Sequence, residues 1–285
     1  MRDRVLIASK TMAKNANDLK KDLETSLKTL RTDYIDVYQL HNPGFCPKPG
    51  DESGLYDALL TAREEGKIRF LGFTNHRIAI AEEMVSSGLY DVLQFPFNYL
   101  STEREIRLVQ TCAEKKIGFV AMKSLSGGLL TNSAAACAYL TGFENVIPIW
   151  GIQREKELDE FLSFIANPPI LDKTLQQVID TDRKELSGDF CRGCGYCKPC
   201  PSGIEIDTCA RASLLLRRAP TNIILSENGQ ASMQKIPDCI ECGQCKERCP
   251  YGLDIPELLK KNYLDFQSIL NETNKTETRN VWTKF

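Results

Sequence analysis

The chain has 285 residues, of which 42% are hydrophobic and 26% are charged, and its formal net charge is −2 at pH 7. That length allows one large and one small domain, and the near-neutral charge provides no basic surface for nucleic acid. No apolar run approaches the roughly 18 residues that a membrane span needs, and Met1–Arg4 lacks the apolar core of a signal peptide. We therefore expect a cytoplasmic protein with no nucleic-acid or membrane partner.

Short apolar runs alternate with amphipathic stretches through the first part of the chain. The strands that we expect are Val5–Ser9, Ile35–Leu40, Ile68–Phe73, Val92–Phe95, Gly118–Met122 and Val146–Trp150. Between and after them, apolar residues recur at helical spacing: Leu19, Leu23, Leu27 and Leu30; Leu55, Leu59 and Ala62; Ile106, Val109 and Ala113; and Leu158, Phe161, Leu162 and Ile165. Such alternation predicts βα units and an α/β fold with a parallel sheet.

The number of these units falls short of a closed barrel. Six strand–helix units are visible in the sequence, whereas a (β/α)8 barrel needs eight, in typically about 250 residues. We therefore expect an incomplete TIM barrel over residues 1–186. Its two open sheet edges would offer a surface for self-association.

Cysteines concentrate in the last third of the chain. Nine of the twelve lie between Cys191 and Cys249, a distribution unlike that of a secreted disulfide protein and typical of a metal-binding module in a reducing compartment. We expect a mainly helical domain over residues 187–270 and a polar tail over residues 271–285. Within the helical domain, we expect a helical turn or two over Arg211–Arg218 and another helix that starts near Pro256.

Two cysteine blocks form an internal repeat. CRGCGYCKPC starts at Cys191, CIECGQCKERC starts at Cys239, and both follow the pattern C-x2-C-G-x-C-K before a final Cys-Pro. The second block matches the C-x2-C-x2-C-x3-C-P run of two-cluster ferredoxins, in which the fourth cysteine binds the other cluster. The first block is one residue shorter before its last cysteine.

This repeat predicts two [4Fe–4S] clusters whose fourth ligands cross over. The predicted ligands are Cys191, Cys194, Cys197 and Cys249 for one cluster, and Cys239, Cys242, Cys245 and Cys200 for the other. A single cluster, zinc or disulfides are the alternatives, although structural zinc commonly uses two separated C-x2-C pairs. Cys200 depends on the short block, and Cys209 is either a substitute ligand or a buried structural cysteine.

Six segments, in this order, resemble the aldo/keto reductase family: RDRVLIASKT, TDYIDVYQLHNP, GKIRFLGFTNH, LQFPFNYL, GFVAMKSLSGGLL and VIPIWGIQREKELDE. The resemblance covers residues 1 to about 165. With the cysteine blocks, the whole chain is similar to aldo/keto reductases that carry a C-terminal 4Fe–4S dicluster domain of the ferredoxin type. It implies an oxidoreductase that reduces a small carbonyl substrate with NADP(H) or NAD(H), and electron transfer between its clusters and a redox partner protein.

The catalytic tetrad of this family is Asp, Tyr, Lys and His. By the resemblance, Lys10 matches the lysine and His41 the histidine, both at the ends of expected strands. The aspartate and the tyrosine lie on two βα units that have no counterpart in this sequence, which implies an N-terminally shortened barrel. A misplaced start, a truncated gene and completion by a second chain are the three explanations, and we favour the first two.

The resemblance also implies positions for the nicotinamide cofactor. Thr74, Asn75 and Gln94 match residues that bind the carboxamide, and Arg154, with or without Lys156, matches a residue near the adenosine ribose phosphate. The aromatic residue that many members stack on nicotinamide is replaced here by Met122. His76 is expected to start a helix, and Gly127-Gly128 to form a turn.

Whether the chain is an enzyme depends on the missing acid. General acid catalysis is typically worth about 10²–10⁴-fold in rate, so a site without its tyrosine would lose much activity. We expect an iron–sulfur oxidoreductase of the aldo/keto reductase type. The alternative is a non-catalytic electron carrier or cluster-binding protein with a vestigial barrel.

Overall fold

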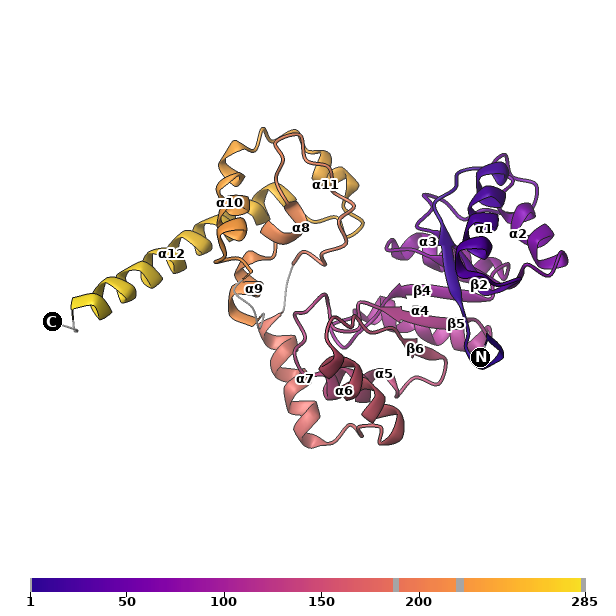
Figure 1. Cartoon of the computed structure of the whole chain (residues 1–285), viewed down its shortest axis with the longest axis horizontal. Helices are drawn as coiled ribbons and strands as arrows, with labels where there is room; N and C mark the ends of the chain where they lie inside the picture. Colours follow the sequence, from indigo (N-terminus) through magenta and orange to yellow (C-terminus); the bar gives the residue numbers. More distant parts are fainter. Residues whose placement is uncertain (1, 187–189, 219–222, 283–285) are drawn as a thin grey trace. The chain divides into compact units, whose positions relative to one another are not determined.

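The computed structural model describes residues 2–186, 190–218 and 223–282 and divides into two compact units (Figure 1). The first unit comprises Met1–Ser124 and Ala134–Gln176, and the second comprises Leu125–Ser133 and Gln177–Phe285. The expected domain boundary at residue 187 falls on residues 187–189, which lie outside the described part. Residues 283–285 of the expected tail also lie outside it.

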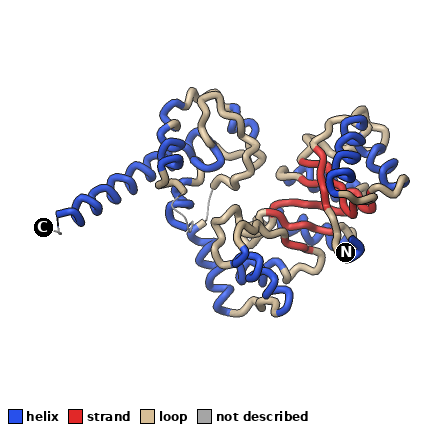
Figure 2. Tube along the Cα trace, viewed as in Figure 1, coloured by secondary structure: helices blue, strands red, loops and turns tan. Residues whose placement is uncertain are grey.

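Six parallel strands form one sheet in chain order (Figure 2). They are β1 (Ala8–Thr11), β2 (Ile35–His41), β3 (Ile68–Thr74), β4 (Val92–Pro96), β5 (Gly118–Met122) and β6 (Val146–Pro148). Each strand pairs with the next, so β1 and β6 are the sheet edges among the described residues. Sequential parallel strands joined by helices are the βα pattern of a TIM barrel, which confirms the predicted α/β fold and incomplete barrel.

A helix follows each of these strands, and most of these helices are amphipathic. They are α1 (Ala16–Leu30), α2 (Leu55–Glu64), α3 (Ile78–Ser87), α4 (Glu103–Glu114), α5 (Ser133–Leu140) and α6 (Glu155–Ala166). In α1 the buried face is Leu19, Leu23 and Leu27, which recur every four residues and pack into the core of the sheet. The side chain of Asn15 begins this helix by accepting a hydrogen bond from the Asp18 amide.

The two faces of the sheet differ in composition. Along β2, Tyr38 and Leu40 belong to the hydrophobic core on the helix side, whereas Gln39 and His41 alternate onto the inner face. The inner face is only partly covered, since Phe70 of β3 is 48% exposed and Ile147 of β6 is 64% exposed. Polar and apolar side chains therefore share a surface that a closed barrel would fill.

A buried carboxylate ties the amino ends of the first three strands together. Asp36 is 1% exposed and accepts hydrogen bonds from the Ile7 amide at 2.8 Å, Arg2 Nη2 at 2.7 Å and Arg69 Nη1 at 3.0 Å. Burial opposes ionisation of Asp36, but these donors outweigh it, and the pKa of Asp36 lies below its ordinary value. Both guanidinium groups also lie over the ring of Tyr34, at 3.9 and 4.1 Å from its centroid.

The second unit is mainly helical, as the sequence predicts. Its helices are the C-terminal part of α7 (Lys173–Glu185), α8 (Ile206–Cys209), α9 (Ala212–Arg218), α10 (Glu227–Gln234), α11 (Gln244–Arg248) and α12 (Ile255–Trp282), with a 3-10 turn at Ile236–Asp238. The buried Asn262 of α12 accepts a hydrogen bond from the Ser213 amide at 2.8 Å, and Arg217 pairs with Asp265. These contacts join α9 to α12.

Two elements differ from the sequence-based expectation. The first strand starts at Ala8, which is the first residue in register with β2, and Leu6 is 77% exposed. The apolar stripe of α6 predicts a buried face, yet only Phe161, stacked on Trp150 at 4.4 Å, is buried, while Ile165 is 78% exposed. Periodicity identifies the helix and its apolar face, but not what covers that face.

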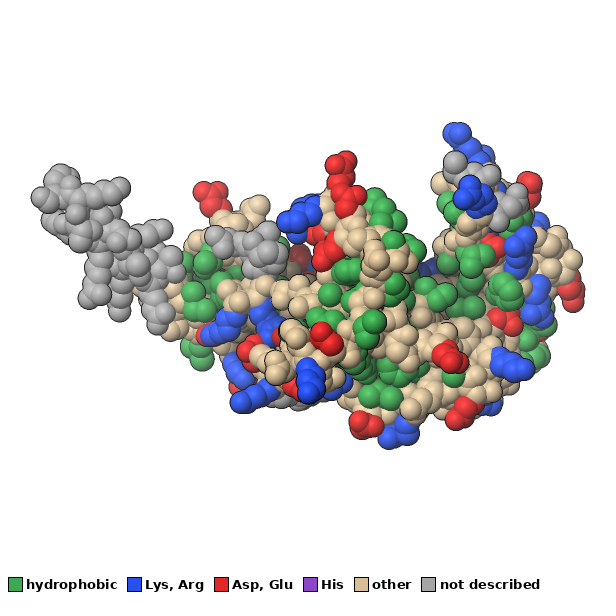
Figure 3. All heavy atoms as spheres, turned by 90° about the horizontal axis from the view of Figure 1, so that it is seen from below, with side chains coloured by type: hydrophobic (Ala, Val, Ile, Leu, Met, Phe, Trp, Pro, Cys, Tyr) green, Lys and Arg blue, Asp and Glu red, His purple; other side chains and the backbone are tan. Residues whose placement is uncertain are grey.

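Charged side chains of both signs are interspersed among apolar ones on the face drawn in Figure 3. This agrees with the near-balance of 36 basic and 38 acidic residues. Among the described residues, no helix is both long and apolar enough to cross a membrane.

The Asp36 network predicts a large stability cost for a small chemical change. We expect Asp36→Asn to lower the free energy of unfolding of the first unit by about 2–4 kcal/mol, because it leaves two cations beside an uncharged, buried amide. Unfolding in urea would be followed by Trp150 fluorescence in a W282F background. As a control, Glu82→Gln removes an exposed pair with Arg104 and should cost less than about 1 kcal/mol. Equal effects of the two substitutions would contradict the role of Asp36.

Candidate functional site

Polar side chains line up across the carboxyl ends of three neighbouring strands. His41 of β2 is in register with Thr74 of β3, and Thr74 is in register with Gln94 of β4. Lys10 of β1 pairs with Gln39, one inward-facing position before His41. Since residues in register share a face of the sheet, these four predicted site residues lie together on the inner face.

The charge state of His41 is set by its surroundings. His41 is half-buried, and burial followed by the positive charge of Lys10 lowers the pKa of its imidazole. The ring is therefore neutral at pH 7 and carries one donor and one acceptor. Lys10 itself is exposed.

The turn after β3 is held by the side chain of Asn75. Asn75 is fully buried, its Nδ2 donates to the Pro43 carbonyl at 2.9 Å, and its Oδ1 accepts from the amides of His76 and Arg77 at 2.9 and 2.8 Å. The Asn42 amide donates to the Thr74 carbonyl at 2.7 Å. Asn75 thus lies beside the row, with its side chain engaged in joining the turns after β2 and β3.

The other two predicted cofactor residues have different surroundings. Gln94 is buried, and its Nε2 lies 3.6 Å from the sulfur of Met122, the residue in place of an aromatic ring. Arg154 begins α6 at the surface, and its guanidinium pairs with Glu157 at 2.6 Å. Gln94 therefore belongs to the row, whereas the contacts of Arg154 are local to its helix.

Sequence reasoning missed one buried polar residue on this face, Gln39. Gln39 is 1% exposed, and neither amide atom of its side chain has a hydrogen-bond partner within the described ranges. Its side chain lies across Gly72, where a Cβ would stand 2.4 Å from Gln39 Cγ. His76 lies just before Arg77, the N-cap of α3, as expected for the start of a helix, and it is 6% exposed. A polar residue alternating with apolar ones at the end of a strand is the signal that identifies Gln39.

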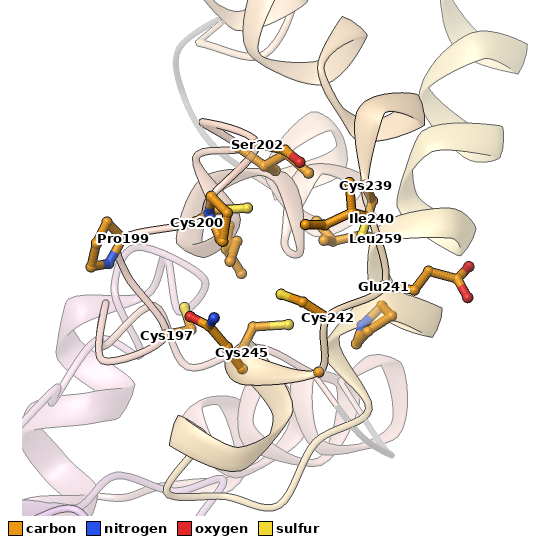
Figure 4. Close-up of a pocket in the computed structure, with 16 residues that line it drawn as sticks. Cys197, Pro199, Cys200, Ser202, Cys239, Ile240, Glu241, Cys242, Cys245 and Leu259 are labelled. Carbon is orange, nitrogen blue, oxygen red and sulfur yellow. The ribbon is translucent and has the colours of Figure 1, made fainter.

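In the second unit, cysteines from both blocks surround one cavity (Figure 4). Its lining includes Cys200, Cys239, Cys242 and Cys245, the four predicted ligands of one cluster, together with Cys197. Cys200, Cys242 and Cys245 direct their sulfur atoms inward, and Glu241 points away. These thiols, in a lining that is mostly apolar, suit a [4Fe–4S] cluster.

The other predicted set also converges. Burial raises the pKa of Cys191, the Gly193 amide at 3.4 Å from its sulfur lowers it, and the nearby thiols of Cys194 and Cys249 raise it again. Cys249 is thus close enough to influence Cys191, while Cys200 shares its cavity with Cys239, Cys242 and Cys245. These positions agree with the crossed pairing of fourth cysteines, which stays a prediction.

A single metal ion and a cluster require different arrangements of these cysteines. Within the described ranges, no three His, Cys, Asp or Glu side chains converge tightly enough to hold one ion. A cubane spreads its four ligands around a larger body, whereas zinc draws them to one point. Cys209 is buried, and its sulfur lies 3.6 Å from the Ser232 carbonyl, which agrees with a structural cysteine.

Comparison with protein families gives two matches along the chain. Residues 1–144 match the aldo/keto reductase family, and residues 190–254 match a 4Fe-4S dicluster domain. The C-terminal region is thus of an iron–sulfur type. The first match ends before Arg154, so it does not include that residue.

Among characterised relatives, the aldo-keto reductase YhdN of Bacillus subtilis is 33% identical over 145 residues, which cover 46% of this chain and 41% of that protein. The NADH-specific methylglyoxal reductase of Escherichia coli is 28% identical over 140 residues, covering 49% of this chain and 42% of that protein. This chain therefore spans about two fifths of the length of these relatives.

Solved structures agree on the fold. The holo form of aldo-keto reductase AKR11C1 from Bacillus halodurans superposes with a TM-score of 0.54 at 20% identity, covering 64% of this chain and 73% of that one. At this level of identity the likeness concerns the fold alone.

The burial of His76 predicts a pH-dependent stability. Burial, then the charges of Lys123, His41 and Arg77, lower the pKa of His76 from 6.5 to about 4. The unfolded chain thus binds a proton that the folded unit excludes, so the free energy of unfolding falls as pH drops from 6.5 to about 4. We expect this fall to be about 2–3 kcal/mol smaller in His76→Gln than in the wild type, measured by urea unfolding with Trp150 fluorescence. His41→Gln should retain the part of the pH dependence that comes from His76. If the free energy of unfolding depends on pH in the same way in the wild type and in His76→Gln, the assignment is refuted.

Proposed function

Since the chain belongs to the aldo/keto reductase family, we propose that it is an iron–sulfur oxidoreductase that reduces a small carbonyl compound with NAD(P)H. In this proposal, two [4Fe–4S] clusters exchange single electrons with a redox partner protein. The observation that carries the proposal is the register that places His41, Thr74 and Gln94 in one row, with Lys10 beside them. Polar groups at the carboxyl ends of barrel strands are where such enzymes build their sites.

The roles we assign follow from the chemistry of each side chain. A nicotinamide cofactor, when bound, supplies the hydride. The neutral imidazole of His41 can donate one hydrogen bond to a carbonyl oxygen and so orient the substrate. Lys10 adds a positive charge near the oxygen on which negative charge develops. Thr74 and Gln94 offer a hydroxyl and an amide for the cofactor carboxamide.

The cluster assignment keeps the crossed pairing. We assign Cys191, Cys194, Cys197 and Cys249 to the first cluster, and Cys239, Cys242, Cys245 and Cys200 to the second. Burial, with the neighbouring thiols, raises the pKa of Cys197 to about 12. The metal-free thiol is therefore protonated at pH 7, so cluster insertion must release protons.

A second candidate function is a non-catalytic electron carrier. It is favoured by one observation: Cys200, Cys239, Cys242 and Cys245 line a cavity of the second unit, and a cluster held there could carry electrons without any carbonyl chemistry.

Turnover by the cluster-loaded, anaerobically prepared chain decides between the two candidates. Methylglyoxal, which the Escherichia coli relative is named for, is the first substrate to test, with NADH and NADPH in parallel. We expect measurable oxidation of the nicotinamide and a loss of at least about tenfold in Lys10→Met, because the charge beside the reacting oxygen is removed. Lys20→Met, on the exposed side of α1, is the matched control. Cluster reduction without any carbonyl-dependent turnover would favour the carrier.

The crossed assignment predicts the iron content of a single variant. We expect about eight irons per reconstituted wild-type chain, and about four in Cys200→Ala, because only the second cluster loses a thiolate. Cys209→Ala should keep the full amount if Cys209 is structural. Iron and sulfide analysis with EPR of the reduced protein measures both. Full iron in Cys200→Ala, or half the iron in Cys209→Ala, would transfer the ligand role to Cys209.

A further inference from the structure

The guanidinium of Arg211 lies against the loop of the first cysteine block. Its Nε donates to the Asp207 carbonyl at 3.0 Å, and its Nη1 donates to the Gly127 carbonyl at 3.1 Å. A Cβ on Gly193, between Cys191 and Cys194, would stand only 2.7 Å from Arg211 Cζ. Glycine at 193, with φ of +61°, thus allows a fixed cation to pack directly on the loop.

The charge of Arg211 reaches a predicted ligand. The guanidinium packs against Gly193, whose amide lies 3.4 Å from the Cys191 sulfur, so a fixed positive charge lies close to this predicted ligand. A group that stabilises one negative charge at this position also stabilises further negative charge on a cluster bound there.

The second block lacks this arrangement. The positions of Arg192 and Gly193 in the first block are taken by Ile240 and Glu241 in the second. Glu241 is exposed and pairs with Lys260 at 2.6 Å. The repeat therefore keeps the cysteine spacing but changes the charge beside each set of thiols.

We propose that Arg211 tunes the first cluster, raising its reduction potential while leaving that of the second cluster unchanged. One-electron reduction of a [4Fe–4S] cluster adds one negative charge to the cluster and its thiolates, with no bond made or broken. A contacting guanidinium favours that reduced form, whereas burial of Cys191 and Cys197 disfavours it. This proposal rests on the assignment of Cys191, Cys194, Cys197 and Cys249 to one cluster.

The same arginine fastens a segment of the reductase sequence to the cluster loop. Gly127 belongs to Leu125–Ser133, which begins three residues after the end of β5 and is part of the second unit. Arg218 adds a second tether, donating to the Leu129 carbonyl at 3.1 Å while pairing with Asp182. Arg211 is thus a positioning residue for this segment as well as a charge beside the cluster.

The test compares Arg211→Gln with two matched variants in the full, anaerobically reconstituted chain. Arg211→Lys keeps the charge, and Arg217→Gln removes the same charge from the surface of α9, where Arg217 pairs with Asp265. Midpoint potentials come from dithionite titrations followed by EPR. We expect one cluster of Arg211→Gln to shift downward by about 59 mV, a tenfold change in its one-electron equilibrium. The midpoint potential of the other cluster, and those of both clusters in Arg217→Gln, should equal the wild-type values. The shifted cluster should have a potential nearer to the wild-type value in Arg211→Lys than in Arg211→Gln.

The EPR signals are assigned with Cys200→Ala, which removes the second cluster and leaves only the signal of the first. The potential of that remaining cluster must still shift downward when Arg211→Gln is added to Cys200→Ala. Unchanged potentials in Arg211→Gln, an equal shift of both clusters, or an equal shift in Arg211→Lys would overturn the proposal. If Arg211→Gln binds no first cluster, Arg211→Lys decides: a wild-type potential supports the role of charge, and loss of the cluster there too overturns it.

A measurement on the metal-free protein tests the tether separately. We expect faster amide hydrogen exchange over Leu125–Ser133 in Arg211→Gln than in Arg217→Gln, since a hydrogen bond to Gly127 is lost. Equal exchange rates would overturn the positioning role. Neither readout involves turnover, so absence of carbonyl reduction would contradict the proposed function and leave this inference standing.

Discussion

The parallel register of β2 with its neighbours is the constraint from which the first unit derives its chemistry. Once His41 pairs with Thr74, and Thr74 with Gln94, three polar side chains must lie on one face of the sheet, at the carboxyl ends of the strands. A shift of one residue would turn them into the apolar core, beside Leu40 and Phe73. Burial of the apolar face against the helices therefore sets the register of the strands, and with it the row of His41, Thr74 and Gln94.

Local patterns in the sequence predict the parts of the structure that local forces determine. The strand centres, the buried stripe of α1 and the position of Cys200 beside the second cysteine block all follow from residue spacing. What spacing does not reveal is which surfaces meet. The apolar face of α6 remains largely exposed, and His76 and Gln39 are buried by residues distant in the chain. Such contacts depend on tertiary packing, which no short sequence window contains.

In the candidate site, too, the sequence predicts the positions of residues better than it predicts their contacts. Lys10, His41, Thr74 and Gln94 were predicted from motifs at strand ends, and parallel pairing brings them together. Asn75 is at the expected place, but its side chain is engaged by the turns around it, and Arg154 pairs within its own helix. A motif predicts a position along the chain, whereas the partners of a side chain depend on the neighbouring loops.

The segment Leu125–Ser133 has a consequence for how such a protein can be rearranged in evolution. It continues directly from β5 in the sequence, yet it is part of the iron–sulfur unit, to which Arg211 and Arg218 bind it. The two units are therefore interleaved along the chain and not arranged end to end. A gene fusion that exchanged only the C-terminal third would separate the arginines from their carbonyl partners. Barrel and cluster region are thus expected to be inherited as one piece and to change together.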